Sequence, residues 1–208
     1  MFIKVCGITK PSQAAHLSEL NVSYVGCIHF EGSPRHNSLE ELKTLASATS
    51  KKILVTVDLT IEQTIKAAKA LDTGILQLHG NESPEHCHKL RNEGYKIIKA
   101  ISVYNKADFN ETGKYKGFVD QFLFDTKGEN KGGNGFKFDW TMLQEYQLET
   151  PFILSGGISI QDAESIRKLN HSKLSGIDIN SRFEVVPGIK NITLIKEFLN
   201  QINHEQLV

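Results

Sequence analysis

Short apolar runs rich in β-branched residues recur along the chain and are separated by segments with helical spacing. These runs cover residues 2–6, 24–29, 53–57, 75–78, 96–101, 119–124, 152–154 and 175–179. Most of them are continuous rather than alternating, which is typical of parallel strands covered by helices on both faces. The pattern therefore predicts eight parallel strands.

The intervening segments carry helix-start signals. Pro11 and Pro84 stand where a first-turn proline belongs, and Ser83, Ser159 and Asn191 are at N-cap positions. Strands alternating with helices in one chain of 208 residues predict an α/β fold, a single-domain (β/α)8 TIM barrel over residues 1–208. A doubly wound open sheet is the alternative, but no dinucleotide-type glycine fingerprint follows the first strand.

Charge and cysteine content narrow the class of protein. Lys and Arg total 24, as do Asp and Glu, so the neutral chain has no electrostatic footprint for nucleic acid or an anionic membrane. No apolar run approaches the roughly 18 residues of a membrane span. Cys6, Cys27 and Cys87 are odd in number, and neither they nor the histidines have metal-ligand spacing. We therefore expect reduced cysteines, a cytoplasmic protein and no metal site.

Chemistry in such a barrel lies where strands end and the following loops begin. Cys6 ends the first strand, and Asp125 directly follows the sixth predicted strand. A strand-end cysteine is often only a small buried hydrophobe, but its place at the mouth favours a functional role. The glycine-rich segment 127–135 after Asp125 is a candidate lid that closes over a ligand.

The loops after strands seven and eight are the usual phosphate site of this fold. Gly156-Gly157 leads into a helix start, where backbone N–H groups can approach an anion, although a plain tight turn is the alternative. Asn180 and Ser181 follow strand eight. Arg35 is either a surface residue or a planar fork for a carboxylate, and His79 is either a ligand contact or a rim residue.

Six stretches together resemble the phosphoribosylanthranilate isomerase family of tryptophan biosynthesis. They are "KVCGIT", "SPR", "LQLHG", "FDTKGENKGGNGFKFDW", "LSGGI" and "GIDINS" followed by "PGIKN", in the family's order over nearly the whole chain. The resemblance implies an Amadori rearrangement of N-(5-phosphoribosyl)anthranilate to 1-(2-carboxyphenylamino)-1-deoxyribulose 5-phosphate. It implies a small phosphosugar–anthranilate substrate, no cofactor, and a monomer or homodimer.

The same resemblance implies a role for each candidate residue. Cys6 is the general base, Asp125 is the general acid, and Arg35 holds the anthranilate carboxylate. The sugar phosphate is bound by Gly156, Gly157, Asn180 and Ser181, and the pocket is also lined by His79 and Asp178. Arg182 stands where the family commonly has glycine, so it is either an added phosphate contact or a surface or subunit contact. Asp58 and His29 also depart from the family's usual strand endings.

Lys4 has a predicted role of its own. The pKa of a free thiol is about 8.5, so Cys6 needs a nearby cation to act as a thiolate. Lys4 and Cys6 share one face of the first strand because side chains alternate. A lysine inside the barrel is costly unless paired, and Asp178 on the adjoining eighth strand can face it. We predict a Lys4–Asp178 ion pair. Its role is either structural alone, or Lys4 also lowers the pKa of Cys6 by placing positive charge beneath the thiol.

Other functions remain as alternatives. The related histidine-pathway isomerase is expected to carry an Asp in place of Cys6. A ribulose-phosphate epimerase needs metal-binding His and Asp at its strand ends. A non-catalytic phosphate-binding module predicts the loss of Cys6 or Asp125, and both are present.

Overall fold

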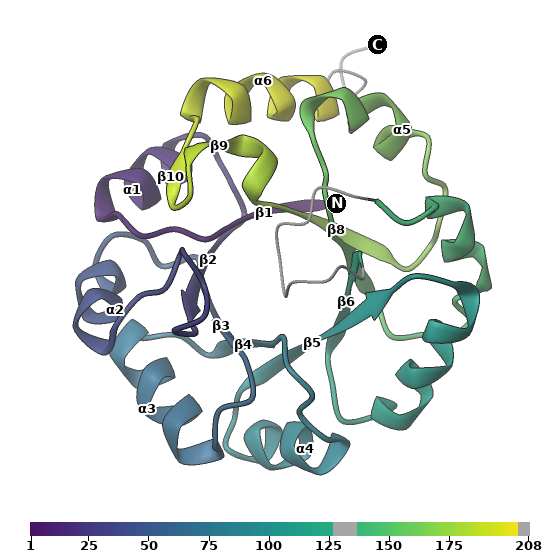
Figure 1. The fold of residues 1–208 in the computed structure, drawn as a ribbon, viewed down its shortest axis with the longest axis horizontal. Coiled ribbons are helices and arrows are strands. Elements are labelled where there is room, and N and C mark those ends of the chain that lie inside the picture. The colour runs from purple at the N-terminus through teal and green to yellow at the C-terminus, as the bar shows by residue number, and fades with distance from the viewer. Residues whose placement is uncertain (127–136, 204–208) are drawn as a thin grey trace.

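The structure is a computed structural model that describes residues 1–126 and 137–203. Within these residues, eight parallel strands pair in chain order and close on themselves, with β1 beside β8 (Figure 1). The strands are β1 (Phe2–Cys6), β2 (Tyr24–His29), β3 (Lys52–Thr56), β4 (Ile75–Leu78), β5 (Lys96–Val103), β6 (Gln121–Thr126), β7 (Phe152–Leu154) and β8 (Leu174–Ile179). The closed sheet confirms the predicted barrel and excludes the open doubly wound sheet.

Helices form a ring around the strands, as Figure 1 shows. The α-helices are α1 (Pro11–Glu19), α2 (Leu39–Ala46), α3 (Ile61–Leu71), α4 (Pro84–Asn92), α5 (Ala163–Arg167) and α6 (Ile192–Asn203). The 3₁₀ helices are η1 (Lys106–Tyr115), η2 (Trp140–Glu145), η3 (Ile160–Asp162) and η4 (Ser181–Phe183). A short hairpin of β9 (Glu184–Val186) and β10 (Ile189–Lys190) follows β8 and lies near α1.

The predicted helix starts are found with one change. Pro11 and Pro84 open α1 and α4, the Ser83 side chain accepts from the His86 N–H, and the Asn191 side chain accepts from the Leu194 N–H. Ser159 precedes the 3₁₀ turn η3 rather than an α-helix, and α5 begins only after that turn. At Ser159 the contact differs as well, since its N–H and its hydroxyl both donate to the Asp162 carboxylate.

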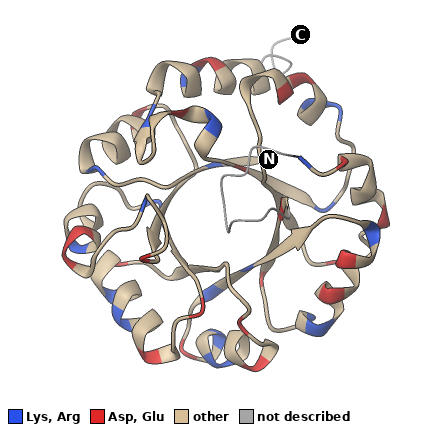
Figure 2. Ribbon diagram, in the orientation of Figure 1, with Lys and Arg blue, Asp and Glu red and all other residues tan. Residues whose placement is uncertain are grey.

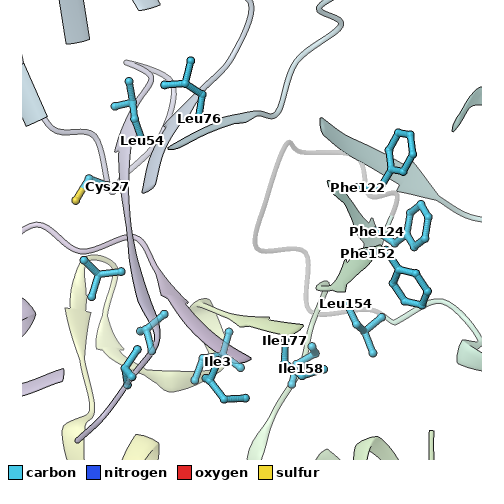
Figure 3. Close-up of a cluster of buried hydrophobic side chains, with 14 of the residues drawn as sticks. Ile3, Cys27, Leu54, Leu76, Phe122, Phe124, Phe152, Leu154, Ile158 and Ile177 are labelled. Atoms are coloured by element: carbon cyan, nitrogen blue, oxygen red, sulfur yellow. The ribbon is translucent and has the colours of Figure 1, made fainter. Parts of the chain in front are cut away.

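Side chains alternate between two apolar layers. Inside the barrel lie Ile53, Ile98, Ala100, Leu123 and Ile153. Outside it, a larger layer packs the strands against the helices, and in Figure 3 Phe122, Phe124 and Phe152 gather on β6 and β7. The Phe124 and Phe152 ring centroids are 5.0 Å apart. Close packing of this kind holds the end of β6 in place.

The sixth strand begins and ends two residues later than predicted. It pairs with β5 as far as Val103 and Thr126, because β5 itself continues beyond its predicted end. Asp125 is consequently a strand residue, paired in register with Ser102, rather than the first residue of a loop. A carboxylate on a strand is held more rigidly than one on a loop.

Charges of both signs are interspersed over the outer helices (Figure 2). Ribbon segments of Lys and Arg are mixed with segments of Asp and Glu around the ring. No helix in residues 1–126 and 137–203 combines the length and apolarity needed to cross a membrane.

Candidate active site

The carboxyl ends of the strands surround a concave pocket, at the end of the barrel where ligands bind in this fold. Most of the predicted site residues line it, namely Cys6, His79, Asp125, Gly156, Gly157, Asp178, Asn180 and Ser181. Arg35 and Arg182 do not line it. Segment 127–135, the candidate lid, lies outside the described residues.

Cys6 is the last residue of β1, and only 4% of it is exposed. Gly26 on β2 is paired with it in register. A Cβ at Gly26 would lie 2.8 Å from the Cys6 Sγ and 3.0 Å from the Lys4 Nζ. The missing side chain therefore lets the thiol and the ammonium occupy the same part of the barrel interior.

The predicted Lys4–Asp178 ion pair is present. The Lys4 Nζ donates to the Asp178 Oδ2 at 2.8 Å, and the two residues are partners in the β1–β8 register. Burial opposes the charged form of Lys4, but the charges of Asp178 and Cys6 outweigh it and raise the pKa of Lys4. The Asp178 Oδ1 is buried without a hydrogen-bond partner among the described residues, which leaves it available to a ligand in the pocket.

The prediction for the Cys6 pKa is only partly met. Burial raises the pKa of the Cys6 thiol, while the positive charges of Lys4 and Lys190 lower it and Asp178 adds to the rise. Lys4 thus acts in the predicted direction, but burial is the larger effect. The thiolate depends on two cations rather than one, and the sequence pattern pointed only to Lys4.

Asp125 is hydrogen-bonded at both oxygens. Its Oδ1 accepts from the Thr126 N–H at 2.9 Å, and its Oδ2 lies 3.2 Å from the His79 Nε2. The Gln77 amide nitrogen lies 2.9 Å from the His79 Nδ1. With Gln77 donating, the imidazole carries its proton on Nε2 and donates to Asp125. Gln77 was not predicted, although a polar residue inside the apolar run "ILQL" is a signal for it.

The turn after β7 lies close to the end of β6 because it contains a glycine pair. Gly156 and Gly157 both have positive φ angles, +92° and +66°. A Cβ on Gly156 would lie 2.3 Å from the Thr126 Oγ1 and 2.9 Å from the Asp125 Oδ1. Only glycine therefore permits this turn to stand beside the carboxylate. Gly156 and Gly157 line the pocket together with Asn180 and Ser181.

Two predicted binding residues lie beside the pocket rather than in its wall. Arg35 is buried, and its guanidinium is paired with Glu184 at 2.6 Å. Arg182 is exposed and lines a neighbouring hollow with Gly157 and Ser159. Neither arginine side chain therefore lines the main pocket.

Asp58 and His29, the two residues that depart from the family's usual strand endings, both make hydrogen bonds to neighbouring loops. The Asp58 carboxylate accepts from the Asn81 N–H, and its own N–H donates to Glu82, which ties two loops together. The His29 Nδ1 lies 2.7 Å from the Asn37 carbonyl oxygen. Neither residue lines the pocket.

The sequence matches the family model described as N-(5'phosphoribosyl)anthranilate (PRA) isomerase over residues 3–201. The chain belongs to this family. It is therefore an enzyme of tryptophan biosynthesis, and its activity is PRA isomerisation. The resemblance seen in the sequence is confirmed, and the competing epimerase, histidine-pathway and non-catalytic interpretations are excluded. No metal-type cluster of His, Cys, Asp or Glu occurs in the part of the chain that the structure describes.

Relatives and solved structures agree with this assignment. A PRA isomerase of Parabacteroides distasonis is 45% identical and covers 98% of this chain and 94% of its own length. The crystal structure of phosphoribosyl anthranilate isomerase from Thermotoga maritima has a TM-score of 0.86 at 27% identity, covering 98% and 99% of the two chains. A structure of the same enzyme type in complex with reduced 1-(o-carboxyphenylamino)-1-deoxyribulose 5-phosphate has a TM-score of 0.83 at 26% identity and the same coverage.

Proposed function

We propose that Cys6 and Asp125 are the base and the acid of the PRA isomerase reaction. The observation that carries this assignment is their position. They line one pocket from β1 and β6, strands that are not neighbours in the barrel. A substrate between them has one group on each side, and both groups are of the type that proton transfer requires.

Asp125 delivers the first proton in this proposal. Protonating the furanose ring oxygen breaks its bond to C1′, while the lone pair of the anthranilate nitrogen forms the C1′=N bond of the Schiff base. The hydrogen bond from His79 and the Thr126 N–H fix the orientation of the carboxyl group. Fixed orientation is one of the larger contributions to rate that an enzyme can make.

Cys6 takes the second proton. Removal of the C2′ proton by the thiolate forms the C1′=C2′ bond and returns the electrons of the C=N bond to nitrogen. The resulting enol becomes the C2′ ketone as C1′ gains a proton. The cations Lys4 and Lys190 favour the thiolate that this step needs.

The two charged ends of the substrate are held by groups that do not react. Gly156, Gly157, Asn180 and Ser181 bind the phosphate, with Arg182 beside them. The enzyme solved with the reduced product analogue holds a ligand that carries a phosphate and an aryl carboxylate at opposite ends, which supports two separate anion sites. Arg35 takes the carboxylate, while His79 and Asp178 contact the sugar between the two sites. Binding energy at these ends offsets the cost of orienting the reacting carbons.

The remaining sequence predictions complete the proposal. We place one catalytic domain over residues 1–208, working in the cytoplasm as a monomer or homodimer without a cofactor. Its partner is the small phosphosugar–anthranilate substrate rather than nucleic acid or membrane.

Complementation tests this assignment in a cell. A tryptophan auxotroph that lacks PRA isomerase should grow without tryptophan when it expresses the wild-type chain. It should fail to grow with the Cys6→Ala, Asp125→Asn double variant, which removes both proton-transfer groups. Equal levels of folded protein, measured by immunoblot of the soluble fraction, are the control. Growth supported by the double variant would refute the assignment of both residues.

A further inference from the structure

A buried charged cluster lies between the β2–α2 loop and the β9–β10 hairpin, outside the pocket wall. It consists of Arg35, Glu184 and Lys190. The Arg35 Nε donates to the Glu184 Oε1 at 2.9 Å, and the Arg35 Nη2 donates to the Oε2 at 2.6 Å. The Lys190 Nζ donates to the same Oε1 at 2.7 Å. The proposed reaction uses Arg35 and Lys190 but gives Glu184 no part, so the role of this carboxylate needs a separate explanation.

Glu184 is the centre of the cluster. Its side chain is 4% exposed, and its Oε1 also accepts from the Gly188 N–H at 3.0 Å. Burial alone would raise the pKa of this carboxyl, but the hydrogen bonds and charges of Arg35 and Lys190 hold it below its usual value. Glu184 is therefore an ionised carboxylate locked by donors from three residues, and it cannot swing into the pocket.

The guanidinium that Glu184 holds is only partly used. Arg35 contacts Glu184 through Nε and Nη2, which form one edge of the guanidinium group. Among the described residues, its Nη1 makes no hydrogen bond. Two cations also face one carboxylate, which leaves the cluster with a net charge of +1 when Lys190 is protonated. A site with an unused donor edge and an excess positive charge suits one further carboxylate.

The cluster also contacts Asn180, which lines the pocket. A Cβ on Gly7, the residue after Cys6, would lie 2.5 Å from the Arg35 Cδ and 2.8 Å from the Asn180 Oδ1. Both side chains thus converge on the end of β1. The Lys190 Nζ donates to the Asn180 Oδ1 at 2.7 Å, so the same lysine contacts Glu184 and the pocket-lining Asn180.

We propose that Glu184 is a positioning residue that preorganises Arg35 for the carboxylate of the substrate and thereby sets the specificity for an anthranilate-type amine. The inference rests on the role of Arg35 in the proposed function. Holding the guanidinium in place before binding removes the entropy cost of ordering a long side chain in the complex. Glu184 touches no reacting atom, and its contribution lies in substrate affinity.

The test compares two ligands on the whole enzyme. One is the reduced product analogue, 1-(2-carboxyphenylamino)-1-deoxyribitol 5-phosphate, and the other is the same compound without the carboxyl group. Isothermal titration calorimetry gives Kd for each, and their ratio measures the preference for the carboxylate. In Glu184→Gln we expect this ratio to fall about three- to tenfold, the effect of ordering one mobile side chain. We expect Kd for the ligand without carboxylate to change less than the ratio does.

Two further variants separate geometry from charge. Glu184→Asp keeps the negative charge but moves the carboxylate back by one methylene, so a positioning role predicts a similar fall in the ratio. Glu82→Gln is the matched control, since Glu82 is equally buried in an ion pair, with Lys99 at 3.1 Å. Its ratio should match the wild type, while any loss of thermal stability should resemble that of Glu184→Gln.

The outcomes distinguish the inference from the proposal beneath it. If the wild type and Arg35→Met show the same ratio, Arg35 does not bind the carboxylate and the proposed function is wrong at that point. If Arg35→Met loses the preference but folded Glu184→Gln and Glu184→Asp keep or increase it, Arg35 does bind the carboxylate and the positioning role of Glu184 is refuted.

Discussion

Asp125→Asn is expected to lower kcat by about 10²–10⁴-fold, the usual contribution of a general acid. Asparagine keeps the size of the side chain but has a single acceptor oxygen, so it retains only one of the contacts from His79 and Thr126, and it has no acidic proton for the ring oxygen. KM should change much less, because Asp125 is not among the groups proposed to bind phosphate or carboxylate. Steady-state loss of substrate fluorescence measures both constants.

A matched control is available for this substitution. Asp72 is an exposed residue at the end of α3 with a φ of +53°, a conformation that asparagine adopts readily. Asp72→Asn should therefore leave kcat unchanged. Losing a general acid lowers kcat by much more than about threefold. If the kcat of Asp125→Asn stayed within about threefold of the wild-type value, another residue would have to protonate the ring oxygen.

Lys4→Met is expected to affect both stability and acid–base chemistry. It leaves the buried Asp178 without its cation, and breaking such a pair costs about 3–5 kcal/mol of unfolding free energy. It also removes one of the two positive charges that lower the pKa of Cys6, whose burial already raises it. The thiol pKa should rise further, so the acidic limb of kcat/KM against pH should move to higher pH.

The thiol can be observed selectively. Burial raises the pKa of Cys27 and Cys87 to about 12, so neither should be alkylated near neutral pH. The pH dependence of iodoacetamide alkylation, followed by mass spectrometry of the Cys6 peptide, then reports the Cys6 pKa alone. Upward displacement of this curve is the expected result for Lys4→Met.

Lys99→Met separates the electrostatic effect from the loss of stability. Lys99 is another fully buried lysine in an ion pair, with Glu82, but it is not among the charges that act on Cys6. Both variants should melt at a lower temperature, and only Lys4→Met should alter the alkylation curve. A folded Lys4→Met protein with the wild-type curve would show that the ion pair is structural only.

Much of the fold could be predicted because its physical causes are local. Parallel strands buried on both faces leave continuous apolar runs, and prolines and cap residues mark the helix starts. The Lys4–Asp178 pair could also be predicted, because alternation places Lys4 inside the barrel and closure brings β8 beside β1. Strand ends were less accurate. The end of β6 depends on how far β5 extends as its partner, which no single run reveals.

The site contacts that were missed depend on distant parts of the chain. Arg35 and Glu184 are 149 residues apart, and their pairing requires the hairpin after β8 to lie beside the loops that follow β1 and β2. The space at Gly26 matters only because β2 lies beside β1. Gln77 acts through a histidine two residues later on the same strand face. A sequence shows the residue types of such contacts but not their partners.

The rate of Cys6→Ala tests the central claim, that Cys6 is the base, most directly. Purified wild type and Cys6→Ala are mixed with N-(5-phosphoribosyl)anthranilate at one pH, and the fall in substrate fluorescence is followed over a range of concentrations. We expect a kcat at least about 100-fold lower for Cys6→Ala, with a KM of similar size, since the thiol takes a proton but holds neither anion. A Cys6→Ala enzyme that turns over at nearly the wild-type rate would contradict it.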